Sequence, residues 1–248
     1  MPVIPLLLLL RGTALRCFAL KLKLKLQLFW TGGTTSITIP YHSLAVTLLA
    51  GRTSLPITGK LWRVIAMSSK WLHRSCWGLY QSLWGLPTSC IEDAVGEFYQ
   101  NITISYYPAC PQPHLTLGLQ SHSDMGAITL LIQDHVGGLQ IFKDSQWITV
   151  HPQSHAILVI LADQMEIITN GKYRSAQHRA ITNSSSPRLS VATFHDPAKT
   201  AKISPASELI SSSSPPKYRE VKYGDYVSSW YTKGPKGKRN IDALLVNS

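Results

Sequence analysis

Two histidines and one aspartate, His122, Asp124 and His178, lie in a part of the chain made of short apolar segments. In an extended strand the side chains of residues i and i+2 share one face, so His122 and Asp124 can reach a common ion. The third ligand, His178, must then come from another strand. Two imidazoles and one carboxylate form the ligand set that holds non-haem Fe(II) and leaves coordination positions open. The spacing therefore predicts an iron site on a β-rich frame.

Arg188 and Ser190 follow ten residues after His178 and again share one face of a predicted strand. A planar guanidinium and a hydroxyl can hold a carboxylate by charge-assisted hydrogen bonds. These two residues predict an anion site beside the metal.

Short apolar segments separated by turn signals dominate the second half of the chain. Turn signals include Gly137-Gly138 and Asn170-Gly171. Many short strands at regular spacing predict an all-β sandwich or barrel. We also expect helices at 91–98 and 223–231. The predicted strands are 101–107, 127–133, 139–143, 147–150, 156–161, 172–181 and 189–195.

Several consecutive motifs carry a family resemblance from about Glu97 onward. They read SYYPACPQPHLTLGLQSHSDMGAITLLIQD, VGGLQI, ITNGKYRSAQHRAITN and PRLSVATF. This part of the chain resembles the plant 2-oxoglutarate/Fe(II)-dependent dioxygenases and is most similar to flavanone 3-hydroxylase-like members. The resemblance implies a mainly β fold, a double-stranded β-helix or jelly roll with flanking helices.

The resemblance also assigns roles to the motif residues. It implies that three side chains bind iron, namely His122, Asp124 and His178. Arg188 and Ser190 would hold the distal carboxylate of 2-oxoglutarate, and Tyr107 would add a hydrogen bond to that cosubstrate. The family often has Asn before its Tyr-Tyr-Pro motif, whereas this chain has Ser105. That departure bears on how the cosubstrate is positioned.

Two further residues fall where related enzymes contact their substrate. Phe194 matches a position where flavonoid-acting members stack an aromatic ring, although the simpler interpretation is a core aromatic residue. Asp196 matches a position where some members place a carboxylate near substrate hydroxyls.

The activity that the resemblance implies needs Fe(II), 2-oxoglutarate as cosubstrate and O2, with ascorbate as the reductant. The enzyme would hydroxylate or desaturate a flavonoid-like small aromatic metabolite and release succinate. Two alternatives stay open. One is a truncated, catalytically impaired family member, and the other is an oxygenase that acts on a plant hormone.

The positive charge of the chain is unevenly distributed. The formal net charge is +11, but residues 1–96 hold 10 Lys and Arg against two acids, whereas residues 97–248 hold 14 against 11. Because the excess lies outside the predicted catalytic part, we infer no nucleic-acid partner. The small-molecule substrate is what the resemblance implies. We also expect no stable membrane association, although Leu20 to Leu28 alternates like an amphipathic strand or a membrane-surface element. The four cysteines lack CxxC spacing, which indicates free thiols in a reducing cytosol. We expect a cytoplasmic protein and a monomer.

The first 90 residues do not resemble the helical region that the family carries there. We therefore divide the chain into an atypical segment, 1–90, and a catalytic domain with a C-terminal helical tail, 91–248. Permissible codons for 74–85, read from the third base, encode KLLGLISESLG, an amphipathic helix. We interpret about residues 52–86, or the whole segment, as an out-of-frame translation; disorder, an organelle transit peptide and a genuine divergent N-terminus are the alternatives. The coding nucleotide sequence decides between them.

Overall fold

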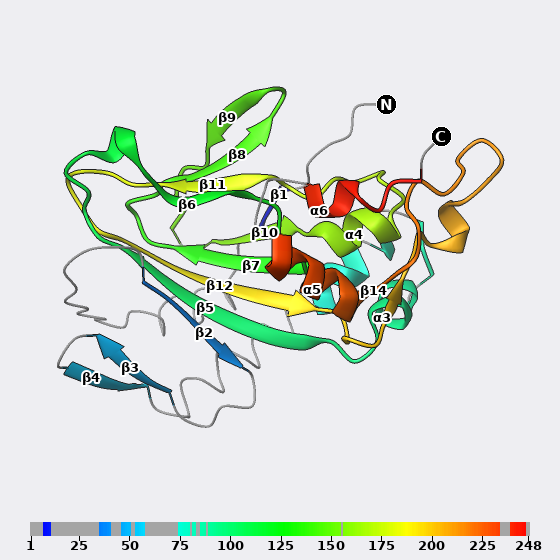
Figure 1. The fold of residues 1–248 in the computed structure, drawn as a ribbon, viewed down its shortest axis with the longest axis horizontal. Helices are drawn as coiled ribbons and strands as arrows, with labels where there is room; N and C mark the ends of the chain where they lie inside the picture. Colours follow the sequence, from blue (N-terminus) through cyan, green and yellow to red (C-terminus); the bar gives the residue numbers. More distant parts are fainter. Residues whose placement is uncertain are drawn as a thin grey trace.

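The computed structural model describes residues 7–10, 35–40, 46–50, 53–57, 74–79, 81–82, 85–87, 89–154, 156–233 and 239–246. Within these residues the chain forms two larger antiparallel sheets and several short helices (Figure 1).

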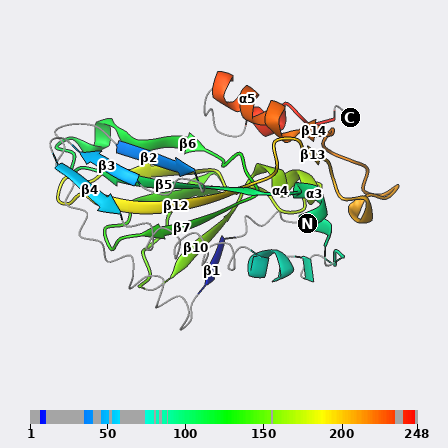
Figure 2. The same cartoon turned by 90° about the horizontal axis from the view of Figure 1, so that it is seen from below.

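The larger sheet has six strands in the order β1-β10-β7-β12-β5-β2, and Figure 2 shows this order from bottom to top. All neighbouring strands in it are antiparallel. Its long central pair is β5 and β12, which align over nine residue pairs from Arg188↔Tyr107 to Asp196↔Tyr99. The strands are β1 (Leu7–Leu10), β2 (Thr35–Pro40), β5 (Tyr99–Tyr107), β7 (Ile128–Gln133), β10 (Ile157–Leu161) and β12 (Arg188–Asp196).

The smaller sheet has four strands in the order β6-β11-β8-β9. These strands are β6 (Leu117–His122), β8 (Leu139–Lys143), β9 (Gln146–Thr149) and β11 (His178–Ile181). Sequence neighbours thus alternate between sheets, as in a jelly roll. The remaining strands form two small hairpins, β3 (Val46–Ala50) with β4 (Thr53–Ile57) and β13 (Lys202–Ile203) with β14 (Val221–Lys222).

The inner strands of the large sheet are apolar on both faces, which explains the continuous runs in β7 and β10. One face carries Ile102, Leu130 and Val159, which belong to the main core cluster together with helix residues. The other face carries Leu131, Leu158 and Ile160, which form a second cluster with Leu139 and Ile141 of the small sheet. Burial on both faces favours β-branched and aliphatic residues throughout, as these strands have.

Short helices cover the first of these faces, and one of them carries a buried polar network. The helices are α3 (Cys90–Val95), α4 (Asp163–Ile168), α5 (Tyr223–Lys233) and α6 (Arg239–Asp242), with two 3-10 turns, η1 (Pro113–Leu115) and η2 (Ser207–Leu209). On α4, Asp163 accepts hydrogen bonds from Ser175 Oγ (2.6 Å) and Tyr226 Oη (2.7 Å). Glu166 accepts from the Ser175 amide (2.7 Å) and from Tyr218 Oη (2.7 Å). These bonds tie α5 and the C-terminal segment to α4.

The structure confirms the predicted jelly roll and most of its strands to within two residues. The prediction of a strand over 172–181 is wrong for its first six residues, because a turn continues from Asn170-Gly171 and only His178–Ile181 pairs. The predicted helices appear at 90–95 and 223–233. The strand β6 and the helix α4 were not predicted. The alternating stretch 20–28 lies outside the described residues.

The first 90 residues contribute two edge strands to the large sheet: β1 pairs with β10, and β2 pairs with β5. The division at residue 90 stays a prediction. Cys76, Cys90 and Cys110 are free thiols, as the sequence indicates. Among the described residues no helix is long and apolar enough to cross a membrane.

Candidate metal centre

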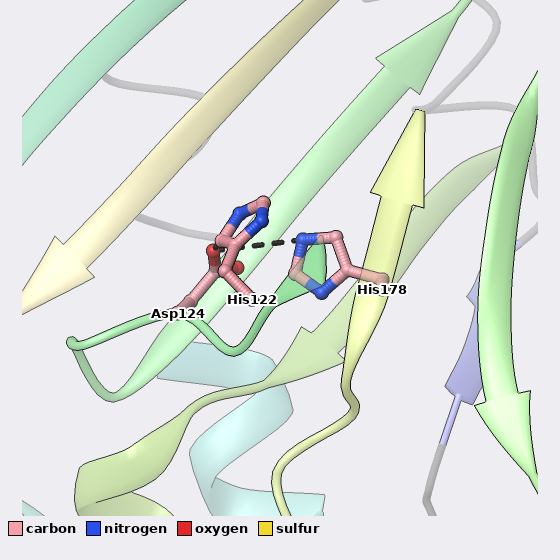
Figure 3. A group of neighbouring side chains, drawn as sticks. All are labelled: His122, Asp124 and His178. Atoms are coloured by element: carbon pink, nitrogen blue, oxygen red, sulfur yellow. Dashed lines mark ion pairs between the residues drawn. The ribbon is translucent and has the colours of Figure 1, made fainter. Parts of the chain in front are cut away.

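Three side chains from two strands and one loop converge on a common point (Figure 3). His122 is the last residue of β6 and His178 the first of β11, and the two are register partners, with ring centroids 4.4 Å apart. Asp124 Oδ1 lies 3.5 Å from His122 Nε2 and 3.6 Å from His178 Nε2. One ligand atom from each residue lies within 4.8 Å of the others, so a single ion could contact all three.

Asp124 reaches this point from a loop, not from a strand. β6 ends at His122, so the argument that both residues share a strand face does not hold. The N-terminus of α4 fixes the loop instead, because the Asp163 amide donates to the Asp124 carbonyl at 2.9 Å. The Gln164 side chain donates to the Met125 carbonyl at 2.8 Å. The helix that the sequence did not predict is therefore what positions the carboxylate.

Hydrogen bonds to the backbone set the tautomer of both imidazoles. His122 Nδ1 lies 2.8 Å from the Gln120 carbonyl, and His178 Nδ1 lies 2.8 Å from the Ala176 carbonyl. A carbonyl oxygen only accepts, so each Nδ1 carries the proton in the neutral ring. Each Nε2 then presents its lone pair to the shared point, which is the arrangement that metal-ligating histidines use.

Burial and mutual attraction act in opposite directions on the pKa values of the three groups. Burial would raise the pKa of Asp124, but the two imidazoles and a 2.5 Å hydrogen bond from Thr129 Oγ1 lower it to about 2. Burial lowers the pKa of His178, and attraction to Asp124 does not offset this. Burial also acts to lower the pKa of His122, but the interactions with Asp124 and the Gln120 carbonyl together outweigh it and raise this pKa. The centre thus holds one permanent negative charge, which suits a divalent cation.

A cavity of about 360 Å³ opens between the two sheets and has the three side chains in its wall. Alternate residues of β5, from Asn101 to Tyr107, and of β12, from Arg188 to Asp196, line one side. Leu119, His178 and Ala180 of the small sheet line the other. Its volume lies in the range of small-molecule sites in proteins, roughly 300–1,000 Å³.

Arg188 and Ser190 share a face of β12, as predicted, and both are buried in this cavity. Arg188 donates from Nη1 to Ser190 Oγ (3.0 Å) and from Nη2 to Gln133 Oε1 (3.3 Å), and its guanidinium lies 4.9 Å from the centre of the Tyr107 ring. Its Nε is buried without a hydrogen-bond partner in the structure. Burial lowers the pKa of Arg188. A buried cation held by neutral groups is poised to receive an anion.

Phe194 and Asp196 line the same cavity toward the other end of β12. Asp196 is 3 % exposed and accepts a hydrogen bond from Asn101 Nδ2 at 2.9 Å. Burial raises the pKa of Asp196 to about 6. The cavity therefore has a cationic end at Arg188 and an acidic, hydrogen-bonding end at Asp196.

The cavity wall includes residues that sequence reasoning did not assign to the site, among them Asn101, Trp230 and Tyr231. The last two lie near the C-terminal end of α5, for which the sequence predicts a helix but no place at the site. The available signal was the spacing of Tyr223, Tyr226 and Trp230, which recur every three or four residues on one helix face.

The centre and its frame match known proteins. Residues 98–197 match the 2OG-Fe(II) oxygenase superfamily. The chain is 46% identical over 166 residues to protein DMR6-LIKE OXYGENASE 2 of Arabidopsis thaliana, covering 66% of this chain and 48% of that protein. It is 41% identical over 159 residues to flavanone 3-dioxygenase 2 of Oryza sativa subsp. japonica, covering 64% and 45%. The chain thus spans about half the length of these curated relatives.

A solved structure supports the same assignment. The crystal structure of JOX2 in complex with 2OG, Fe and JA superposes with a TM-score of 0.78 at 30% identity, covering 86% of this chain and 64% of that one. The sequence match, the shared fold and the convergent His-Asp-His group agree with one another. Residues 98–197 thus form a domain of the 2OG-Fe(II) oxygenase superfamily, and the curated relatives support a plant 2-oxoglutarate/Fe(II)-dependent dioxygenase.

Proposed function

We propose that the protein is a dioxygenase that uses Fe(II), 2-oxoglutarate and O2 to oxidise a small aromatic metabolite. One observation carries this proposal: a two-histidine, one-carboxylate group lines the same cavity as the buried guanidinium of Arg188, which has no salt-bridge partner among the described residues. His122, Asp124 and His178 would hold the iron. Arg188 and Ser190 would hold the distal carboxylate of 2-oxoglutarate, with Tyr107 beside them.

The donor set fits Fe(II), since two neutral imidazoles and one carboxylate leave coordination positions open. When bound, iron and 2-oxoglutarate supply the oxidation: O2 converts the cosubstrate to succinate and carbon dioxide and delivers one oxygen atom to a substrate C–H bond.

The chain's own residues bind, orient and exclude water. The guanidinium of Arg188 would form an ion pair with a carboxylate of the cosubstrate. Its buried Nε has no hydrogen-bond partner among the described residues, so binding the carboxylate would not first require an existing ion pair to break. The backbone carbonyls of Gln120 and Ala176 keep the Nδ1 protons in place and leave Nε2 free. Apolar side chains such as Leu131, Leu139 and Ile160 keep the cavity poor in water beside the metal.

For the substrate we propose a flavonoid-like aromatic compound. The similarity to flavanone 3-dioxygenase 2 and the hydrogen-bonding end at Asp196 support this choice. A plant hormone is the second candidate, because the JOX2 structure contains JA and has the same fold. A catalytically impaired family member is the third, because the first 90 residues do not resemble the region that the family carries there. We propose Phe194 as the ring contact and Asp196 as the hydroxyl contact.

An anaerobic titration tests the proposal. Purified protein with Fe(II) and 2-oxoglutarate should develop the charge-transfer absorption of the chelated cosubstrate. His178→Ala should abolish this absorption, whereas a change at the distant, exposed Arg219 should leave it unchanged. Protein that is folded but shows no absorption contradicts the proposal.

Turnover separates the candidates. Succinate release that a flavanone stimulates more than jasmonate supports the first substrate class, and the reverse order supports the hormone. Chelation without succinate release identifies the impaired member. Size-exclusion chromatography and cell fractionation test the monomeric state and the cytoplasmic location, which stay predictions.

A further inference from the structure

One face of α5 connects the barrel core to the cavity. Tyr223 and Tyr226 are almost fully buried, and both belong to the main core cluster. Trp230 lies one helical turn beyond Tyr226 on the same face, since residues three and four apart are neighbours on a helix. At this turn the helix leaves the core, and Trp230 lines the cavity together with the adjacent Tyr231.

The inner end of α5 is held firmly to the loop that carries Asp124. Tyr226 Oη donates to Asp163 at 2.7 Å, and the amide of the same Asp163 donates to the carbonyl of Asp124 at 2.9 Å. Figures 1 and 2 both show α5 near α4 at this end of the barrel. Two hydrogen bonds therefore separate the helix from the metal loop, so the aromatic residues at its outer end have a defined place relative to the metal.

Trp230 is half-buried and Tyr231 is exposed, so both rings leave some surface available. Tyr231 is 69 % exposed, and its ring contacts Trp230 edge-on, with centroids 5.5 Å apart at 81°. Exposed aromatic surface that borders a cavity favours a ligand, because burying each ring contributes more than most side chains can. The other wall of the same cavity carries Phe194, and the polar pair Asn101 and Asp196 lies beside it.

We infer that Trp230 and Tyr231 form the ring-recognition element of this cavity, and that the substrate carries a planar aromatic ring which packs against them. This inference rests on the proposed function and deepens it, because it assigns the mouth of the cavity to an aromatic ring and disfavours a substrate that lacks one. A carboxylate at this end would also lie near the acidic Asp196, which opposes an anionic group there.

Ligand binding to the full-length chain tests the inference. Equilibrium dialysis with Mn(II) and 2-oxoglutarate measures the Kd of a flavanone, naringenin, and of jasmonate, which has no aromatic ring. Trp230→Ala should raise the naringenin Kd about tenfold and Tyr231→Ala several-fold, whereas the jasmonate Kd should change less than about twofold. Trp230→Phe should retain naringenin binding, because it keeps an aromatic face.

Phe142→Ala is the matched control. This exposed aromatic residue packs against Trp147, and it is not among the residues that line the cavity. Its loss should leave both Kd values unchanged.

Two results would overturn the inference: wild-type protein that binds no naringenin, or Trp230→Ala and Tyr231→Ala proteins that both bind it with the wild-type Kd. Because Tyr231 is exposed, its replacement should not unfold the chain. The Fe(II) and 2-oxoglutarate absorption, recorded on the same samples, reports separately on the proposed function. If this absorption is absent but naringenin still binds, the result contradicts the proposed function and still supports ring recognition by Trp230 and Tyr231.

Discussion

Arg188 illustrates how a single residue can indicate a missing ligand. Arg188 is 3 % exposed, and its guanidinium donates hydrogen bonds to the neutral side chains of Ser190 and Gln133. Removing a cation from water costs several kcal/mol unless opposite charge compensates. No salt bridge within the described residues involves Arg188. Burial of Arg188 therefore carries a desolvation cost, which an anionic cosubstrate would offset by supplying the opposite charge.

Replacing Arg188 should therefore separate cosubstrate binding from metal binding. Arg188→Met removes the charge and keeps most of the side-chain volume, so the Kd of 2-oxoglutarate should rise about a hundredfold, since charged hydrogen bonds contribute roughly 1.5–3 kcal/mol each. The Kd of Mn(II), measured by paramagnetic resonance, should stay within about twofold. Arg219→Met, at an exposed arginine, is the control. Equal 2-oxoglutarate affinity in the two variants would show that Arg188 has another role.

Asp196 should make the metal-free protein less stable as pH rises. Its pKa is raised from 3.8 to about 6, so the folded state binds a proton that the unfolded state has already released in this interval. Stability then falls between about pH 4 and pH 6 and stays lower above it, by about 3 kcal/mol. Asp196→Asn keeps an acceptor for Asn101 and should remove this slope. Urea unfolding at several pH values measures it, and parallel pH profiles for both proteins would contradict the assignment.

At the scale of elements, the two faces of β12 could be predicted from the sequence, because side chains in a strand alternate between its faces. Arg188 and Ser190 alternate with residues that face the core, so the period of two predicts that they share one surface. α4 was not readable, because Asp163 and Glu166 interrupt its apolar residues and are themselves buried. Their burial depends on Ser175, Tyr218 and Tyr226, which are distant in sequence.

The same limit applies to the metal ligands. The ligand types were readable from the sequence, but the loop position of Asp124 depends on hydrogen bonds from α4. The position of α5 at the cavity could not be predicted for a similar reason. The periodicity of a helix predicts which of its faces is buried, but not which part of the protein that face packs against.

The link between α5 and α4 should be measurable through one hydroxyl. Tyr226→Phe removes a 2.7 Å hydrogen bond to the buried Asp163 and should lower the free energy of unfolding by about 1–3 kcal/mol. The effect should be larger than for Tyr231→Phe, which removes a hydroxyl from an exposed ring. Urea unfolding of both variants measures the difference. If the two lose the same stability, the Tyr226 hydroxyl does not support the buried carboxylate.

For the whole molecule, the metal should add a link between the small sheet and the loop that α4 holds. His122 and His178 come from the small sheet, and Asp124 comes from the loop that α4 holds. An ion at their shared point binds the folded state alone, because the three ligands are dispersed in the unfolded chain. At a free concentration one hundred times its Kd, Mn(II) should stabilise the protein by about 2.7 kcal/mol. For a chain of this size that corresponds to a rise in Tm of about 5–10 °C, which differential scanning fluorimetry can measure.

The rise in Tm should shrink at acidic pH, since the ligating nitrogens must be free of protons, and it should vanish in Asp124→Asn and His178→Ala. A control variant without one of the other histidines, such as His151→Ala, should keep the full rise. If Mn(II) raises the Tm equally in all of these proteins, the ion binds elsewhere, and the three side chains do not form its binding site.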